Sequence, residues 1–477
     1  MRRFSIAAVL GALALSGCVT VGPNFSTPIA PVSEGYAMQG DADAPAEVAL
    51  TPSHEINRQW WRSLASPSLD ALVEQALRQN RTLAAADAAL ARARAQLSAA
   101  RGGAMPQIDY STGAERERVN TAAFGIEGFP SPTISLYSVG ANAVFDLDLF
   151  GGQRRRIEGA AARAQAQALR TDAAYLTLSG QVVTRAIDIA SLEAQLTAAE
   201  HIVADDERVL DMIRRSIAAG GAPASAETAA IAQFAEDEAR LPPLRVQLAQ
   251  ARHALSALVG QAPGSWAPPA IALDAITLPD RIPVSLPSSL VRARPDILAA
   301  EADLHAATAD IGVATAALYP RISLGAAFSV ASLEPETLFN YDSAGWSFGP
   351  SLTGPLFRGG TLRAQRRGAQ AAQIEAMARY EQTVLSAFVQ VSDLLQAVAQ
   401  GRTLVEAQTR AAAAAAENAR LAELAYENGA GTLLQVIDAQ RQSQRARLGF
   451  IQANAQLRRD VAALFVATAS DWRAAAT

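Results

Sequence analysis

The strongest constraint in this sequence is that its second half repeats its first. Three short landmarks recur in the same order about 210 residues apart. They pair Met105-Pro106-Gln107-Ile108 with Tyr319-Pro320-Arg321-Ile322, Leu149-Phe150-Gly151-Gly152 with Leu356-Phe357-Arg358-Gly359-Gly360, and Ala219-Gly220-Gly221 with Asn428-Gly429-Ala430-Gly431. Because the copies of a duplicated unit share one fold, the same architecture has to serve both halves. We expect each half to run as helix, strand, strand, long helix and helix.

Prolines separate the two repeats. Six of them crowd one stretch, where they cannot continue a helix: Pro263, Pro268, Pro269, Pro279, Pro283 and Pro287. We therefore place a linker at 261–287, between a first repeat at 65–260 and a second repeat at 288–467. An extended segment rich in proline and small residues, 18–64, precedes the first repeat, and a tail, 468–477, follows the second.

The first residues read as an export signal. Arg2 and Arg3 precede an apolar stretch, 4–15, that is too short to span a bilayer, which is the pattern of a secretory signal peptide. We place this signal at 1–17. The stretch closes with Leu15-Ser16-Gly17-Cys18, which resembles the lipobox of bacterial lipoproteins, so Cys18 is predicted to carry a covalent lipid. The alternative is a plain signal peptide with a chance cysteine. A single cysteine leaves no internal disulfide.

Alternating side chains predict four strands, at about 106–119, 134–149, 320–333 and 344–357. In the second of these, for example, the apolar Ala141 and Phe145 alternate with Asn142 and Asp146. No run of 18 apolar residues follows residue 18, so we expect any membrane crossing to use these strands, which have the length that a bilayer requires. The edge of a soluble sandwich is the alternative.

Four strands cannot close a barrel by themselves. An open sheet edge in hydrocarbon leaves backbone groups unpaired, at several kcal/mol each, so a membrane sheet of this size must be completed by other copies. Two copies would give eight strands, whose interior fills with side chains, whereas three would give twelve strands and room for a lumen. If the protein is a conduit, three copies are therefore favoured, because only the larger barrel leaves a lumen.

Two uninterrupted stretches predict very long helices. No proline occurs from Gly152 to Gly220 or from Thr361 to Asn428, and each stretch would reach roughly 100 Å as a helix. Both end in glycine-rich turns, which we take as hairpin tips: Gly220, Gly221, Gly429 and Gly431. Returning helices follow at 223–260 and 432–466. On the first long helix, apolar residues at coiled-coil spacing run from Leu192 to Ile217 and are interrupted once, by Asp206.

Charge and composition argue against several other functions. The net charge is -5, so no broad basic surface is present to bind nucleic-acid phosphates. Four scattered histidines, His54, His201, His253 and His305, do not have zinc-ligand spacing. We expect no metal, no cofactor and no catalytic residue. The acidic cluster Asp205-Asp206-Glu207 is the only hint of an enzyme, and a solvated helix face explains it better.

Several motifs together resemble one family. They are Cys18-Val19-Thr20-Val21-Gly22-Pro23-Asn24-Phe25, Trp60-Trp61 before Ser66-Pro67-Ser68-Leu69, Arg292-Ala293-Arg294-Pro295-Asp296-Ile297, Tyr319-Pro320-Arg321-Ile322, Tyr426-Glu427-Asn428-Gly429 and Val436-Ile437-Asp438-Ala439-Gln440-Arg441. In these the chain resembles the outer membrane efflux proteins, the TolC-like channels, and their lipoprotein branch that serves resistance-nodulation-division (RND) pumps. The likeness extends from Cys18 to about Ala467. The first hairpin tip, 219–224, departs from the family pattern.

The resemblance implies a fold and a function. The fold would be a homotrimer in which a twelve-stranded barrel in the outer membrane continues into an α-helical barrel across the periplasm. The function would be that of a lipid-anchored, passive exit duct for drugs or other small molecules. A periplasmic adaptor and an inner-membrane RND transporter would be its partners, beside the lipid of the outer membrane. The alternative is a trimeric lipoprotein that spans the periplasm without a transport role.

The resemblance also implies where a gate would lie. The family closes its periplasmic end with inward-pointing carboxylates and ion pairs near the last hairpin, which assigns that role to Asp438, with Arg441 as its partner. A solvated helix-surface aspartate is the alternative for Asp438. Asp146 and Asp148 continue the polar face of a predicted strand and would line a lumen or cap the next helix. Four glycines would permit the bends from strand to helix: Gly151, Gly152, Gly359 and Gly360.

Overall fold

The structure is a computed structural model that describes residues 20–31, 35–38, 40, 48–51, 59–120, 125, 131–279, 282–285 and 287–468. The predicted signal peptide, 1–17, and Cys18 lie outside these residues. The chain divides into two compact units, each assembled from separate stretches. The first unit consists of Met1–Pro28, Ala89–Gln167 and Ala299–Tyr380, and the second of Ile29–Ala88, Ala168–Leu298 and Glu381–Thr477.

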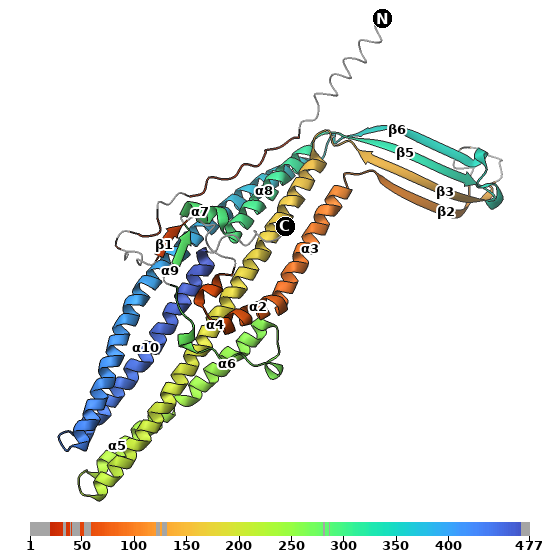
Figure 1. The fold of residues 1–477 in the computed structure, drawn as a ribbon. Helices are drawn as coiled ribbons and strands as arrows, with labels where there is room; N and C mark the ends of the chain where they lie inside the picture. Colours follow the sequence, from red (N-terminus) through yellow and green to blue (C-terminus); the bar gives the residue numbers. More distant parts are fainter. Residues whose placement is uncertain are drawn as a thin grey trace. The chain divides into compact units, whose positions relative to one another are not determined.

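The first unit contains the predicted strands as one sheet (Figure 1). The strands are β2 (Gln107–Arg118), β3 (Thr133–Asp146), β5 (Arg321–Ser332) and β6 (Ala344–Thr353). They lie in the order β2-β3-β5-β6, and every neighbouring pair is antiparallel. The hairpin β2-β3 of the first half therefore lies beside the hairpin β5-β6 of the second half, and the prediction of four strands is confirmed.

The register brings the apolar residues of all four strands onto one face of the sheet. Ala141 pairs with Tyr110 on one side and with Phe328 on the other, and Phe328 pairs with Trp346. Side chains that pair directly across antiparallel strands point to the same face. This face is open, since 79% of Trp346 is exposed and Phe348, Ile108 and Tyr110 are also exposed. The sheet thus presents a broad apolar surface that no described residue of the first unit covers.

The opposite face of the sheet is mostly small and polar. Asn142 pairs with Asp109 and with Ala327, and the hydroxyl oxygens of Ser323 and Ser351 lie 2.8 Å apart on the next pair of strands. Val144 interrupts the pattern. The two faces therefore differ in the way that a wall between lipid and water requires.

The two long helices begin directly after the strands. They are α4 (Gly152–Ala218) and α9 (Thr361–Glu427), and each has 67 residues. Neither contains a proline, and alanine, arginine and glutamine recur throughout, so nothing in the sequence ends them before the glycine turns. Helices α3 (Arg81–Gly102) and α8 (Pro295–Ala316) precede the strands in the two halves. No helix within the described residues is both long enough and apolar enough to cross a bilayer.

The second unit contains the core around the motif Trp60-Trp61. These tryptophans lie in η2 (Trp60–Leu64), which leads into α2 (Pro67–Gln79). Trp60 donates a hydrogen bond from Nε1 to the hydroxyl of Ser179, 3.0 Å away, and its ring stacks on Phe465. Asn80 ends α2 and caps α3, because its side-chain oxygen accepts a hydrogen bond from the amide of Leu83 at 3.0 Å.

The returning helices differ between the two halves. In the second half, α10 (Leu433–Thr468) runs without a break. In the first half the return is split into α5 (Ala224–Glu238) and α6 (Leu241–Val259). Pro242 and Pro243 account for the split, because a proline has no N–H to donate to the preceding turn and its ring clashes with that turn.

Two short strands were not predicted. They are β1 (Val48–Thr51) and β4 (Ile282–Ser285), which pair in parallel as a small sheet in the second unit. Strand β4 lies inside the stretch predicted as a linker, which also contains the single turns η4 (Pro263–Ser265) and η5 (Leu273–Ala275). The short helix α7 (Pro287–Ala293) follows. Four residues are too few for alternation to reveal a strand.

Candidate functional site

The turn from β3 into α4 is built around Asp148. Its carboxylate accepts hydrogen bonds from the backbone amides of Gln153 and Arg154, both at 2.8 Å. The strand ends at Asp146, and Asp148 has a φ of 25°, so the chain has already left the strand geometry. Asp148 therefore does not lie on the polar face of the sheet that the alternation indicated. It caps the first turn of α4, the other role considered for it.

Asp146 remains on the polar face of the sheet. It pairs with Ser323 across the strands, and its carboxylate lies 3.7 Å from Nε of Arg321. Both side chains are largely exposed, so the ion pair is weak. Asp146 is therefore the one of the two aspartates that keeps a candidate position on a lumen.

The four bend glycines have two different roles. Gly151, Gly359 and Gly360 have φ values of 75°, 55° and 83°, a region that residues with a Cβ rarely adopt. Gly152 is not in this region. A Cβ on it would lie 3.0 Å from the Cβ of Ala316, so Gly152 serves the close approach of α4 to α8. The bend assignment thus fits three of the four residues.

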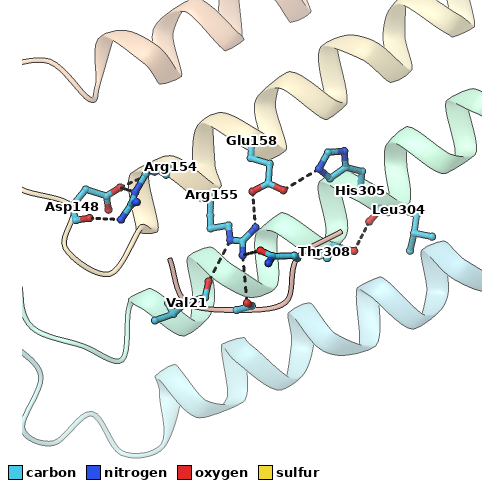
Figure 2. Close-up of polar contacts among 10 residues, drawn as sticks. Val21, Asp148, Arg154, Arg155, Glu158, Leu304, His305 and Thr308 are labelled. Carbon is cyan, nitrogen blue, oxygen red and sulfur yellow. Dashed lines mark hydrogen bonds and ion pairs between the residues drawn. The ribbon is translucent and has the colours of Figure 1, made fainter. Parts of the chain in front are cut away.

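Residues 20–25, which we call the N-terminal strap, lie against this junction (Figure 2). The amide of Val21 donates to the carbonyl of Phe150 at 3.1 Å. Gly22 fits against Gly312 of α8, where a Cβ on Gly22 would come within 2.5 Å of the Gly312 Cα. The ring of Phe25 stacks on His305, with centroids 4.3 Å apart. The strap follows directly after the predicted lipidation site.

Arg155 of α4 holds the strap through its buried guanidinium (Figure 2). Its Nη2 donates to Oδ1 of Asn24 at 2.7 Å, and its Nε donates to the carbonyl of Val21 at 3.3 Å. Its Nη1 donates to Glu158 at 2.7 Å, and the other carboxylate oxygen of Glu158 lies 2.9 Å from Nε2 of His305. One network thus joins α4, α8 and the strap.

The charge state of Glu158 fits this network. Burial alone would raise the pKa of its carboxyl, but hydrogen bonds and charge from Arg155 and His305 outweigh burial and hold that pKa below its ordinary value. Sequence reasoning missed this cluster, although Gly22, Asn24 and Phe25 belong to a motif that it singled out. Their partners lie more than 130 residues away in the sequence, so spacing could not reveal them.

Both hairpin tips end their long helix in the same way. Gly220 has a φ of 75°, and the amide of Gly221 donates to the carbonyl of Ser216 at 2.8 Å. Gly429 has a φ of 69°, and the amide of Ala430 donates to the carbonyl of Ala425 at 2.8 Å. These bonds form a Schellman motif, in which a left-handed glycine ends the helix. Gly431 is in tight contact with the end of α9, since a Cβ there would approach the amide of Tyr426 at 3.1 Å.

An apolar cluster joins the two hairpins near their tips. Val209, Leu210, Ile213 and Ala230 are its buried members, and Leu433 and Ile437 of α10 pack against them. The coiled-coil positions Leu210 and Ile213 predicted from the sequence therefore face both α5 and α10. Ile437 of this cluster is followed directly in the sequence by Asp438, the first of the two candidate gate residues.

Asp438 and Arg441 lie on adjacent turns of α10. Oδ1 of Asp438 is 4.0 Å from Nη1 of Arg441, which is the outer limit of an ion pair. The side chain of Asp438 is 66% exposed and that of Arg441 is 36% exposed. Nε of Arg441 is buried and has no hydrogen-bond partner among the described residues. Asp438 is thus free to face another molecule, while Arg441 faces inward.

In the part of the chain that the structure describes, no group of three or more histidine, cysteine or acidic side chains is placed to hold a metal ion. The candidate site consists of the four-stranded sheet, the turn from β3 into α4 with the N-terminal strap, and the two hairpin tips.

The family model of the outer membrane efflux proteins matches residues 72–261 and 286–470 of this chain. The chain belongs to the outer membrane efflux protein family. The two matched stretches are separated by 262–285, close to the linker at 261–287 that the prolines predicted. The match therefore falls once on each half of the duplicated sequence.

Individual relatives cover nearly the whole chain. It is similar to outer membrane protein OprJ of Pseudomonas aeruginosa, with 32% identity over 98% of this chain and 96% of OprJ. It is also similar to nodulation protein T of Rhizobium leguminosarum, with 29% identity over 98% of this chain and 93% of that protein. The solved MtrE outer membrane channel of Neisseria gonorrhoeae, in its open state, superposes with a TM-score of 0.82 at 27% identity, over 94% of this chain and 98% of MtrE.

These findings confirm the sequence-based predictions of family, fold class and location. The protein has the fold of an outer-membrane channel, and its place is the outer membrane. It is an outer-membrane channel component of an efflux system, and the members of its family are components of transport.

Proposed function

We propose that three copies of this chain form a passive exit duct, and that the exposed apolar face of the four-stranded sheet is the observation that carries this proposal. Strands β2 and β6 are the outer strands of the sheet order, so each offers a backbone edge to a neighbouring copy. In hydrocarbon an unpaired edge costs several kcal/mol for each backbone group. Three sheets of four strands close as a twelve-stranded barrel that is wide enough for a lumen.

The apolar face of the sheet supports an outward position against lipid. Trp346, Phe348 and Phe328 lie on that face, and they would contact the acyl chains. The face with Asn142, Asp146 and Ser323 would then line the water-filled lumen. The long helices α4 and α9 would carry the duct through the periplasm, since each reaches roughly 100 Å.

The assembly would include partners and a lipid anchor. We propose that Cys18, outside the described residues, carries the lipid that fixes the chain to the membrane. A periplasmic adaptor would meet the two hairpin tips, and an inner-membrane RND transporter would supply the energy and the cargo, which we take to be drugs or other small molecules. The chain itself would catalyse no reaction and would need no cofactor beyond its covalent lipid.

The gate of the duct would lie just inside the last tip, at Asp438. Three copies of an exposed carboxylate around a threefold axis would attract cations and repel one another. Arg441, one turn away, would balance that repulsion in the closed state. The position of Asp438 next to the apolar cluster of the two hairpins supports this assignment.

Conductance in planar lipid bilayers tests the duct and its gate together. Purified full-length protein should be trimeric in detergent and should pass ions. Asp438→Ala should raise the conductance several-fold, because it removes the ion pair with Arg441 that would hold the closed state together. Glu417→Ala is the matched control, since Glu417 forms a similar exposed pair with Arg420 three residues along α9. A monomeric protein without ion passage would refute the duct, and unchanged conductance of Asp438→Ala would refute the gate.

Crosslinking tests the partners. A photoreactive residue at Ala222 or Ala430, in the two tips, should capture a periplasmic adaptor in cells that express the whole pump. The same label at Phe339, an exposed residue in the loop between β5 and β6, should not capture it. Equal capture from the hairpin tips and from the loop between β5 and β6 would contradict the proposed orientation.

A further inference from the structure

Asp206, the residue that interrupts the apolar seam of α4, lies in contact with a second carboxylate. That partner is Asp237 of α5, whose side chain is only 2% exposed. Oδ2 of Asp206 is buried and has no hydrogen-bond partner among the described residues, and Oδ1 of Asp237 is buried with only the Nη1 of Arg240 near it, as an ion pair at 3.0 Å. Among the described residues, the side-chain donors that reach Asp237 come from its own stretch of chain: Gln233 donates a hydrogen bond, and Arg240 forms the ion pair. A half-buried carboxylate, that of Asp206, therefore contacts a fully buried one, that of Asp237.

The break between α5 and α6 creates this arrangement. Because Pro242 and Pro243 prevent a continuous helix, α5 ends at Glu238 and Asp237 falls in its last turn. The C-terminus of a helix carries partial negative charge, which disfavours an ionised carboxylate there. In the second half α10 is unbroken, so this feature belongs to the first hairpin alone.

Charged side chains from three parts of the chain surround Asp206 and Asp237. On α4, Asp205 adds a further negative charge beside Asp206. In the break between α5 and α6, Arg240 contacts Asp237 with a side chain that is 46% exposed. On α10, Arg441 faces Asp206, while Asp438 competes for the same guanidinium at 4.0 Å. Burial raises the pKa of Asp206 to about 7, with further contributions from the hydrogen bond and the charge of Asp237, and Arg441 opposes this rise.

We propose that Asp206 and Asp237 share one proton and act as a latch, which holds α4, α5 and α10 together while protonated and loosens them when the proton leaves. The geometry supports this proposal, because loss of the proton leaves two carboxylates in contact at a buried place where three helices meet. The latch rests on the proposed function, since it regulates the gate at Asp438 and Arg441. The pH of the periplasm would thus help to set the open fraction of the duct.

The direction of the effect follows from proton linkage. The packed arrangement binds the proton more tightly than a loosened, solvated one, whose Asp206 would have its ordinary pKa of 3.8. The packing is therefore strongest at acid pH and weakens as the pH rises towards about 7. The ratio of packed to loosened forms falls by at most about tenfold for each pH unit in this window, and less where solvent screens the pair.

Conductance at several pH values between 5.5 and about 8.5 tests the latch in the full-length lipidated protein. The wild-type duct should conduct more as the pH rises towards about 7, and its conductance should level off above that pH. Asp206→Asn, which imitates the protonated acid, should keep the low conductance of acid pH throughout, and Asp237→Asn should do the same. Arg441→Gln should move the pH at which conductance levels off to a higher value, because it removes the cation that opposes protonation of Asp206. Asp211→Asn, an exposed position on the same helix, should follow the wild type.

A spectroscopic measurement gives a second readout that does not depend on the gate. The infrared band of a protonated carboxylic acid should disappear from the wild-type protein near pH 7, and it should be absent from Asp206→Asn. A wild-type pH profile in Asp206→Asn, or the absence of such a band, would overturn the latch. If Asp438→Ala still raises conductance in that case, the duct and its gate stand. If no variant passes ions at any pH, the proposed function itself fails.

Discussion

The guanidinium of Arg155 and the carboxylate of Glu158 lie 2.7 Å apart, one turn along α4, and the side chain of Arg155 is only 4% exposed. The same guanidinium reaches Asn24 of the strap, and the same carboxylate reaches His305 of α8. Two residues of one helix thereby hold a segment from the beginning of the chain against a helix from its second half. The strap is fixed by a buried charge, which makes it sensitive to any change in that charge.

Glu158→Ala should release the strap. It leaves the buried guanidinium of Arg155 without its carboxylate, and breaking a buried ion pair in this way costs about 3–5 kcal/mol. The loss of stability should lie at the lower end of this range, because Arg155 still donates hydrogen bonds to Asn24 and to Val21. Amide hydrogen exchange of residues 20–31 should become faster. Glu375→Ala, which breaks an exposed pair with Arg379, is the control and should leave this exchange unchanged.

The strap should also respond to acid. Because the folded protein holds the pKa of Glu158 below its ordinary value of 4.5, this group contributes stability above that value and loses it as the pH falls through the lowered pKa. We expect the protection of residues 20–31 to be constant from neutral pH down to about 4.5 and to decline only below it. Hydrogen exchange, corrected for the intrinsic rate at each pH, measures this. A decline that begins well above pH 4.5 would contradict the assignment of the response to Glu158.

Gly151→Ala should disturb the same strap from the side of the junction. Gly151 has a φ of 75°, and a Cβ there would lie 2.9 Å from the Cα of Thr20. Backbone strain and the clash together should cost about 1–3 kcal/mol and displace the strap. Gly368→Ala, inside α9, is the control, because a Cβ on Gly368 meets no atom within 4 Å. Hydrogen exchange of the Val21 amide measures this displacement. If the protection of that amide is the same in Gly151→Ala as in the wild type, the contact between Gly151 and Thr20 does not hold the strap.

The sequence predicted those parts of the fold that show a regular spacing of apolar residues or a stretch bounded by proline or glycine. The alternation of Ala141, Phe328 and Trp346 revealed strands because one face of the sheet is apolar and the other is not. The long helices were visible because no proline breaks them, and the tips because Gly220 and Gly429 have left-handed φ values that few residues adopt. These features are local, so the residues that determine them are neighbours in the chain.

The features that the sequence did not predict depend on contacts between residues far apart in the chain, or on the exact residue at which a strand ends. Alternation continues through Asp148 in the sequence, but the strand ends at Asp146, and only the hydrogen bonds to α4 show that Asp148 is a cap. The strands β1 and β4 pair across more than 200 residues and are too short for a period. Asp206 was visible as a break in a seam, but its partner Asp237 lies on another helix, 31 residues further along the chain.

The two faces of the sheet should tolerate charge very differently. Trp346 and Ser347 are neighbours in β6, and their side chains point to opposite faces, the apolar one and the polar one. Trp346→Arg would place a cation against lipid, at a cost of about 2–4 kcal/mol near the middle of a bilayer. Ser347→Arg would place the same cation in a water-filled lumen, at little cost. The amount of assembled trimer in the outer membrane should therefore fall in Trp346→Arg and remain close to the wild type in Ser347→Arg. The reverse order would mean that the apolar face of the sheet does not face lipid.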